Sequence, residues 1–100
     1  MIKQTPQLGI EALTDAADCL RILAHPHRLQ IVQMLLTGSN YSVNDIAEAC
    51  ELTQPTTSDH LRLMQRCGFL KNVRDGRTVY YSIAETHLRD IMNCIQSRFG

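Results

Sequence analysis

The hydrophobic positions of the chain repeat with a helical period over most of its length. Residues 13–24 carry apolar side chains at i, i+3, i+4 and i+7, which predicts an amphipathic helix. The His25-Pro26 step ends this helix, because a proline disfavours the helical conformation in the residue before it. Residues 29–36 are apolar almost all round, so the second helix should be buried. A last apolar stripe predicts a final helix from about Thr86, with Leu88, Ile91, Met92, Ile95 and Phe99 as its members.

Two shorter helices are predicted in the middle of the chain. The stretch Ser42-Val43-Asn44-Asp45 resembles a capping box with Asp in place of Glu, and the helix behind it ends near Cys50. The next helix starts after Thr53, which can cap it, and it stops at Gly68. Two short helices joined by a tight turn, the second beginning with polar groups, have the layout of a helix-turn-helix.

The period of the pattern changes from 3.6 to 2 after Gly68. Residues 69–74 and 78–82 read as strands, and they flank Asp75-Gly76, which is a strong hairpin signal. The order of elements is therefore α-α-α-α-β-β-α, a mainly α winged helix-turn-helix with a small β-hairpin. We expect one domain over residues 10–100, preceded by a flexible arm at residues 1–9.

Composition narrows the class of protein. The 100 residues are 44% hydrophobic and hold ten bases and ten acids, and a zero net charge argues against a nonspecific nucleic-acid binder. Five bases face only two acids between Asp59 and Arg77, and such a local basic patch suits a specific binder. The sequence has no secretory signal and no apolar run near the roughly 18 residues of a membrane span, so we expect a cytoplasmic protein.

A helical projection of residues 53–67 separates polar from apolar side chains. His60, Leu61 and Met64 fall on the inner side, whereas the outer side is short and polar near the helix start and cationic towards its end. A helix that lays its first residues on base edges in a major groove needs this arrangement. The alternative is an ordinary solvated face. The predicted DNA-binding residues are Gln54, Thr56, Ser58, Asp59 and Arg62 on the helix, with Arg74 and Arg77 on the hairpin.

Five fragments in order resemble the ArsR/SmtB family of small repressors: LAHPHRLQIV (23–32), SVNDIA (42–47), QPTTSDHLRLM (54–64), CGFL (67–70) and RDGRTVYYSI (74–83). The resemblance implies a homodimer joined through the first and last helices. It also implies binding to double-stranded DNA at a palindromic operator, and release when an inducer binds.

The resemblance supports Gln54, Ser58 and the position of Asp59 on the base-facing side, and it places Arg74 and Arg77 in the wing. Asp59 departs from the family, in which this position is usually basic or neutral. A carboxylate at this site repels phosphate unless it accepts a hydrogen bond from a cytosine amino group.

The resemblance offers two kinds of metal site for an effector. Family members sense metals through a cysteine motif on the helix before the recognition helix, and this motif is missing from the capping-box helix. Others use acid and histidine ligands on the last helix. Glu85 and His87 match the first pair of that motif, but Arg98 occupies the later histidine position.

Thiols are the other effector candidates. The four cysteines form no C-x-x-C pair, so we expect reduced thiols. Cys19 and Cys94 lie at the edges of the apolar faces of the first and last helices, which should meet at the dimer interface. Together they would bind a soft metal ion or arsenite, or form a disulfide under oxidative or persulfide stress. The alternative is that both are small apolar packing residues, as in family members that bind no metal.

An enzyme is not expected, because the sequence has no phosphate-binding glycine loop and no nucleophile in a recognisable setting. The prediction is a homodimeric transcriptional repressor. The remaining alternative is a protein-interaction module that keeps the winged helix without reading DNA, which the neutral charge and Asp59 favour.

Overall fold

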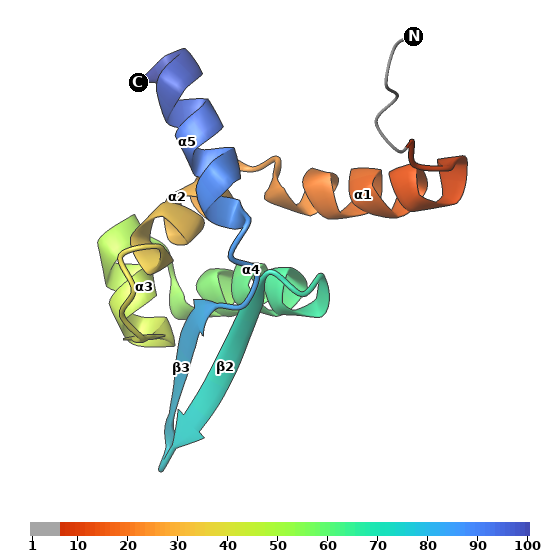
Figure 1. Cartoon of the computed structure of the whole chain (residues 1–100). Coiled ribbons are helices and arrows are strands. Elements are labelled where there is room, and N and C mark those ends of the chain that lie inside the picture. Colours follow the sequence, from red (N-terminus) through yellow and green to blue (C-terminus); the bar gives the residue numbers. More distant parts are fainter. Residues whose placement is uncertain (1–6) are drawn as a thin grey trace, which may run out of the picture.

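The computed structural model describes residues 7–100, which form five helices and a three-stranded sheet (Figure 1). The predicted helices and hairpin are all present, so the winged helix-turn-helix prediction is confirmed. The arm predicted for residues 1–9 falls mostly outside the described residues. The elements in chain order are α1 (Ile10–Leu23), α2 (Pro26–Leu35), β1 (Tyr41–Ser42), α3 (Val43–Cys50), α4 (Gln54–Arg66), β2 (Leu70–Asp75), β3 (Thr78–Ile83) and α5 (Leu88–Phe99).

The sequence-based order of elements lacked the strand β1. Tyr41 and Ser42 pair antiparallel with Tyr81 and Tyr80 of β3, which gives the strand order β1-β3-β2. A strand of only two residues shows no alternation, and it runs directly into the cap of α3. Its pairing partner lies some 40 residues further along the chain, so no local signal could have revealed it.

Local signals explain the ends of the two central helices. The Ser42 hydroxyl accepts a hydrogen bond from the Asp45 backbone N–H (3.0 Å), and the Asp45 carboxylate accepts one from the Ser42 N–H (3.1 Å). The Thr53 hydroxyl caps α4 through the Thr56 N–H, as predicted. Gly68, with φ +87°, ends the turn after α4 in a conformation that favours glycine.

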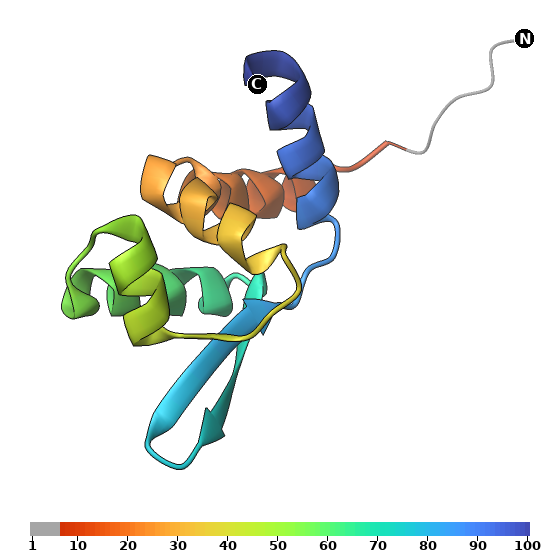
Figure 2. The same ribbon diagram turned by 90° about the vertical axis from the view of Figure 1, so that its left-hand side faces the viewer.

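The hydrophobic core joins α2, α3, α4 and the base of the sheet. The helix α2 buries one side, with Ile31, Val32 and Leu35 in the core, whereas Gln30 and Gln33 are exposed, so the prediction of a helix buried all round holds only in part. Figure 2 shows α3 and α4 between the helices α1 and α2 on one side and the hairpin on the other. The buried cluster consists of Leu23, Ile31, Val32, Leu35, Ile46, Cys50, Leu61, Met64, Phe69, Leu70, Tyr81 and Leu88.

The two terminal helices leave much of their apolar surface uncovered. Leu23 is the one fully buried residue of α1, and Leu88 is that of α5. Leu13 and Leu20 on α1 are 48% and 53% exposed, and Phe99 at the end of α5 is 76% exposed. Both helices project from the body of the molecule, while the hairpin extends away from α5 (Figures 1 and 2). Within residues 7–100, no helix has the length and apolar character needed to cross a bilayer.

Candidate nucleic-acid interface

The helix α4 divides into two faces as the sequence predicted. Its buried residues include His60, Leu61 and Met64, which pack inward. Thr57 is also buried and donates its hydroxyl to the Thr53 carbonyl (2.8 Å), a contact that the projection did not anticipate. The opposite face exposes Gln54, Thr56, Asp59 and Arg62, with Ser58 half-buried beside them.

A groove of about 350 Å³ lies between the start of α4 and the hairpin. Gln54 and Ser58 line it from α4, and Arg77 lines it from the hairpin turn. Two predicted helix residues and one predicted hairpin residue therefore share one concave surface. The full lining is Val43, Asn44, Gln54, Ser58, Arg77, Thr78 and Val79.

Asn44 is a groove residue that the sequence analysis missed. It lies on α3, and its Oδ1 accepts a hydrogen bond from Gln54 Nε2 (3.1 Å). This bond fixes one end of the Gln54 amide and leaves the rest of it free for a ligand. Asn44 lies inside the capping-box motif, and its hydrogen-bond partner Gln54 belongs to the next helix, so the motif alone gave no signal for its place in the groove.

Asp59 forms an ion pair with Arg62 one turn further along α4. Both side chains are largely exposed, so the pair contributes little to stability. Its effect is local, because the guanidinium offsets the carboxylate charge that would otherwise repel a phosphate. The unusual acid of this face is thus balanced within the same helix.

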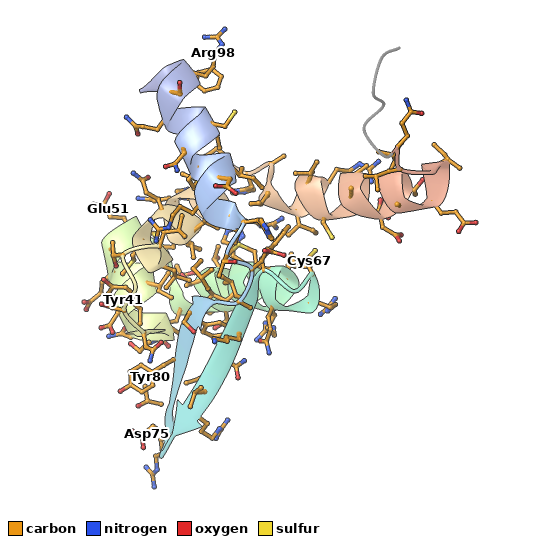
Figure 3. All side chains as sticks on the ribbon, viewed as in Figure 1. Tyr41, Glu51, Cys67, Asp75, Tyr80 and Arg98 are labelled. Atoms are coloured by element: carbon orange, nitrogen blue, oxygen red, sulfur yellow. The ribbon has the colours of Figure 1, made fainter. Side chains whose placement is uncertain are left out.

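The hairpin presents free positive charge at its tip. The last pair of the ladder is Asp75 with Thr78, so Gly76 and Arg77 form the turn, one residue later than the sequence pattern indicated. Gly76 has φ +64°, which favours glycine at this position. Figure 3 marks the tip at Asp75, far from the core. Across residues 7–100, no ion pair involves Arg66, Lys71, Arg74 or Arg77.

A histidine cluster, formed by His25, His27 and His60, lies on the buried side of α4. Arg28 Nε donates to His60 Nδ1 (2.9 Å), and Arg28 Nη1 donates to the Ile22 carbonyl (3.0 Å) near the end of α1. The His25 ring lies 4.8 Å from the His60 ring, centroid to centroid. His60 is buried and hydrogen-bonded, which confirms its predicted place on the inner side of the helix, and Arg28 links α4 to the end of α1.

Burial is the main cause that lowers the pKa of His60 below its usual value. The Arg28 guanidinium and the neighbouring His25 and His27 lower it further, whereas the Asp59 carboxylate acts in the opposite direction. The cluster therefore favours a neutral imidazole that accepts the Arg28 hydrogen bond.

The predicted acid–histidine pair forms, but without further ligands in the described part of the chain. His87 Nδ1 lies 2.7 Å from a Glu85 carboxylate oxygen, which also accepts the His87 backbone N–H (2.9 Å). The backbone N–H and then the ring lower the pKa of Glu85. Among residues 7–100, no three His, Cys, Asp or Glu side chains converge in a way that could hold a metal ion.

The thiols are arranged differently from the sequence-based hypothesis. Cys19 on α1 is half-buried, packs against the same core as Cys67 at the end of α4, and is a close neighbour of the Cys67 thiol. Cys94 is exposed on α5. Within one protomer the neighbour of Cys19 is therefore Cys67, and an approach of Cys19 to Cys94 across a dimer interface stays a prediction.

Comparison with known proteins identifies the family. Residues 25–72 match the family model described as bacterial regulatory protein, arsR family. The transcriptional repressor PagR of Bacillus anthracis is 37% identical over 84 residues, which cover 84% of this chain and 84% of PagR. The chain belongs to the ArsR family. The matched residues run from the histidine cluster through α4 into β2, so the ArsR-family segment contains the helix-turn-helix described above.

Two further comparisons extend the ArsR-family assignment. The HTH-type transcriptional repressor SmtB of Mycobacterium tuberculosis is 37% identical over 82 residues, and the chain covers 60% of its length. The homodimeric winged helix-turn-helix DNA-binding domain Mb0332 of Mycobacterium bovis, described as a possible ArsR-family transcriptional regulator, superimposes with a TM-score of 0.78. It is 28% identical and covers 97% of this chain and 88% of that domain. PagR and SmtB are both transcriptional repressors.

Proposed function

We propose that this ArsR-family chain is a sequence-specific, DNA-binding transcriptional repressor that acts as a homodimer on a palindromic operator. The observation that carries the proposal is the groove in which Gln54 and Ser58 of α4 meet Arg77 of the hairpin. Hydrogen-bonding side chains on a helix start, next to unpaired cations on a wing, match the needs of base-edge and phosphate contacts.

The proposed roles divide along this surface. Gln54, Thr56 and Ser58 reach base edges in the major groove, and Arg62 with its partner Asp59 lies beside them. Arg74 and Arg77 contact phosphates or the adjacent minor groove. Asp59 either accepts a hydrogen bond from a cytosine amino group or orients Arg62. In both roles the Arg62 guanidinium balances the charge of the Asp59 carboxylate.

The homodimer rests on the uncovered apolar faces of α1 and α5. Leu13, Leu20 and Phe99 would lose contact with water in such a dimer, which favours association. The homodimeric state of the Mb0332 domain supports this arrangement. A bacterial-type repressor acts where its operator DNA lies, so we place the protein in the cytoplasm and assign it no catalytic activity.

The candidate residues for binding an inducer lie on or beside the terminal helices α1 and α5. Glu85 and His87 supply two ligands, which are too few for a tight divalent metal site on their own. The thiols Cys19 and Cys94, as candidates for a soft metal ion, a metalloid or an oxidant, remain part of the proposal.

Selection of binding sites from a random duplex library tests the proposal. A dimeric repressor enriches palindromic sequences, and its affinity for them falls steeply with salt, with a slope of about −0.9 per neutralised phosphate. A winged helix that serves only as a protein-interaction module enriches no sequence, and that outcome would overturn the proposal.

A further inference from the structure

Two thiols from distant parts of the sequence meet where α1 crosses the end of α4. Cys19 lies on α1, and Cys67 is the C-terminal cap residue of α4. The two helices pack against each other, and both cysteines are half-buried against the same hydrophobic core. The Cys19 thiol is the neighbouring ionisable group that most affects the Cys67 thiol, so the two sulfur atoms are neighbours. Figure 3 shows Cys67 at the end of α4 on the side that faces α1.

The surroundings of Cys67 disfavour its thiolate form. Burial is the largest cause that raises the pKa of the Cys67 thiol, and the adjacent Cys19 thiol raises it further. The Asp18 carboxylate adds to this effect, and the Arg28 guanidinium opposes it. Cys67 is therefore disfavoured as the first nucleophile, and we assign it the second step.

We propose that Cys19 and Cys67 are a dithiol modification site that hydroperoxides convert into a disulfide between α1 and the end of α4. The Cys19 thiol gives up its proton and its sulfur attacks one peroxide oxygen. An S–O bond forms and the O–O bond breaks, which leaves Cys19 as a sulfenic acid. The departing oxygen takes up the thiol proton, so that hydrogen peroxide yields one water. The Cys67 sulfur then attacks the Cys19 sulfenic sulfur. An S–S bond forms as the S–O bond breaks, and the released hydroxide takes the Cys67 proton as a second water.

The consequence follows from where the bond lies. Cys67 is the last residue before Gly68, at which the chain turns from α4 into the hairpin. A disulfide there ties the helix with the uncovered apolar stripe to the C-terminal end of the helix that lines the groove. Any effect on operator binding rests on the proposed function, whereas formation of the bond does not.

Tryptic peptide mapping under non-reducing conditions tests the site. Cleavage after lysine and arginine places the cysteines in four different peptides, residues 4–21, 29–62, 67–71 and 90–98. The protein, reduced and carrying Cys94→Ser to remove the exposed thiol, is treated with equimolar hydrogen peroxide and then alkylated. The expected result is a linked pair of peptides 4–21 and 67–71 that is two hydrogen atoms lighter than their sum.

Cys19→Ser and Cys67→Ser, each added to Cys94→Ser, should abolish the linked pair, and circular dichroism checks that these variants stay folded. The Cys94→Ser protein keeps both thiols, so its result decides the matter even if a serine variant unfolds. Two results would overturn the proposal: peptides 4–21 and 67–71 recovered only in alkylated or over-oxidised form, or peptide 4–21 linked to 29–62 or to its own copy. Neither result depends on whether the protein binds DNA.

Discussion

His60 shows how a single buried side chain can set the position of the recognition helix. It lies on the inner face of α4, and Arg28 connects it to the carbonyl of Ile22 near the end of α1. The imidazole must be neutral to accept the Arg28 N–H, because a protonated ring has no free lone pair. The residue thus couples α4 to its supports only while it is uncharged.

The lowered pKa of His60 makes stability depend on pH in a defined direction. Between the depressed folded pKa and the unfolded value of 6.5, the unfolded chain binds more protons than the folded one. The free energy of unfolding should therefore be retained above pH 6.5 and decrease as the pH falls below it. Besides Asp59, which opposes this trend, the groups that face His60 are the cationic Arg28 and the titratable His25 and His27.

Urea unfolding at a series of pH values checks this prediction. His60→Gln keeps a neutral acceptor for Arg28, so its free energy of unfolding should decrease less on acidification than that of the parent. Gln96→Ala, which replaces an exposed side chain of α5 that does not titrate, is the control and should follow the parent. Equal pH dependence in the parent and His60→Gln would contradict the interpretation.

Gln54 and Ser58 carry the prediction on sequence choice. Replacing either with alanine should relax discrimination at one operator position by about 1–3 kcal/mol while leaving the fold intact. Gln96→Ala, on the exposed face of α5, should change nothing. Competition binding against single-base operator variants measures the effect, and unchanged discrimination in both groove variants would remove these residues from base recognition.

Residue contacts were the hardest part to predict from the sequence. The outward direction of Gln54 and the inward direction of His60 follow from a helical period alone. The partners of these residues do not, since Asn44 and Arg28 belong to other helices. The pairing of Cys19 with Cys67 depends on how α1 crosses α4, and no spacing within the sequence encodes a crossing angle.

At the scale of elements, the helix ends and the hairpin could be predicted because short-range interactions along the sequence determine them. The Ser42 and Thr53 caps, the proline starts of α2 and α4, and the glycine after α4 are each specified by neighbours within four residues. The hairpin was foreseen because its two strands alternate around a glycine turn. β1 was missed because two residues form a strand only through pairing with β3.

The α3 cap yields a stability prediction. Ser42→Ala removes the acceptor for the Asp45 N–H and should lower the free energy of unfolding by about 1 kcal/mol. Thermal and urea unfolding measure the change. Ser97→Ala on α5, where serine accepts no cap hydrogen bond, serves as the control. A variant as stable as the parent would mean that the capping box contributes nothing to folding.

The hairpin yields a prediction on nonspecific affinity. Arg74→Ala and Arg77→Ala should each weaken binding to all duplexes about equally and reduce the salt slope by about 1. Arg98→Ala, near the end of α5, should leave both quantities unchanged. Titrations at several salt concentrations provide the measurement, and a wing that contacts no DNA would show parental affinity even at low salt.

At the scale of the whole molecule, the uncovered stripes of α1 and α5 are the dominant feature. A chain of 100 residues buries a limited share of its surface, and a second copy can cover the rest. Leu20→Glu should therefore shift the protein from dimer to monomer in sedimentation experiments. Val73→Glu, which alters an exposed apolar residue of the hairpin, should remain dimeric. A monomeric parent, or a dimeric Leu20→Glu variant, would contradict this arrangement.

The number of chains on one selected palindromic duplex tests the account most directly. Sedimentation of the complex should give two chains per duplex, because each chain places one α4 in successive major grooves on the same side of the DNA. Inserting about five base pairs, half a helical turn, between the half-sites should abolish this complex. A single chain per duplex, or an undiminished complex after the insertion, would contradict the claim that two copies bind one operator through their α4 helices.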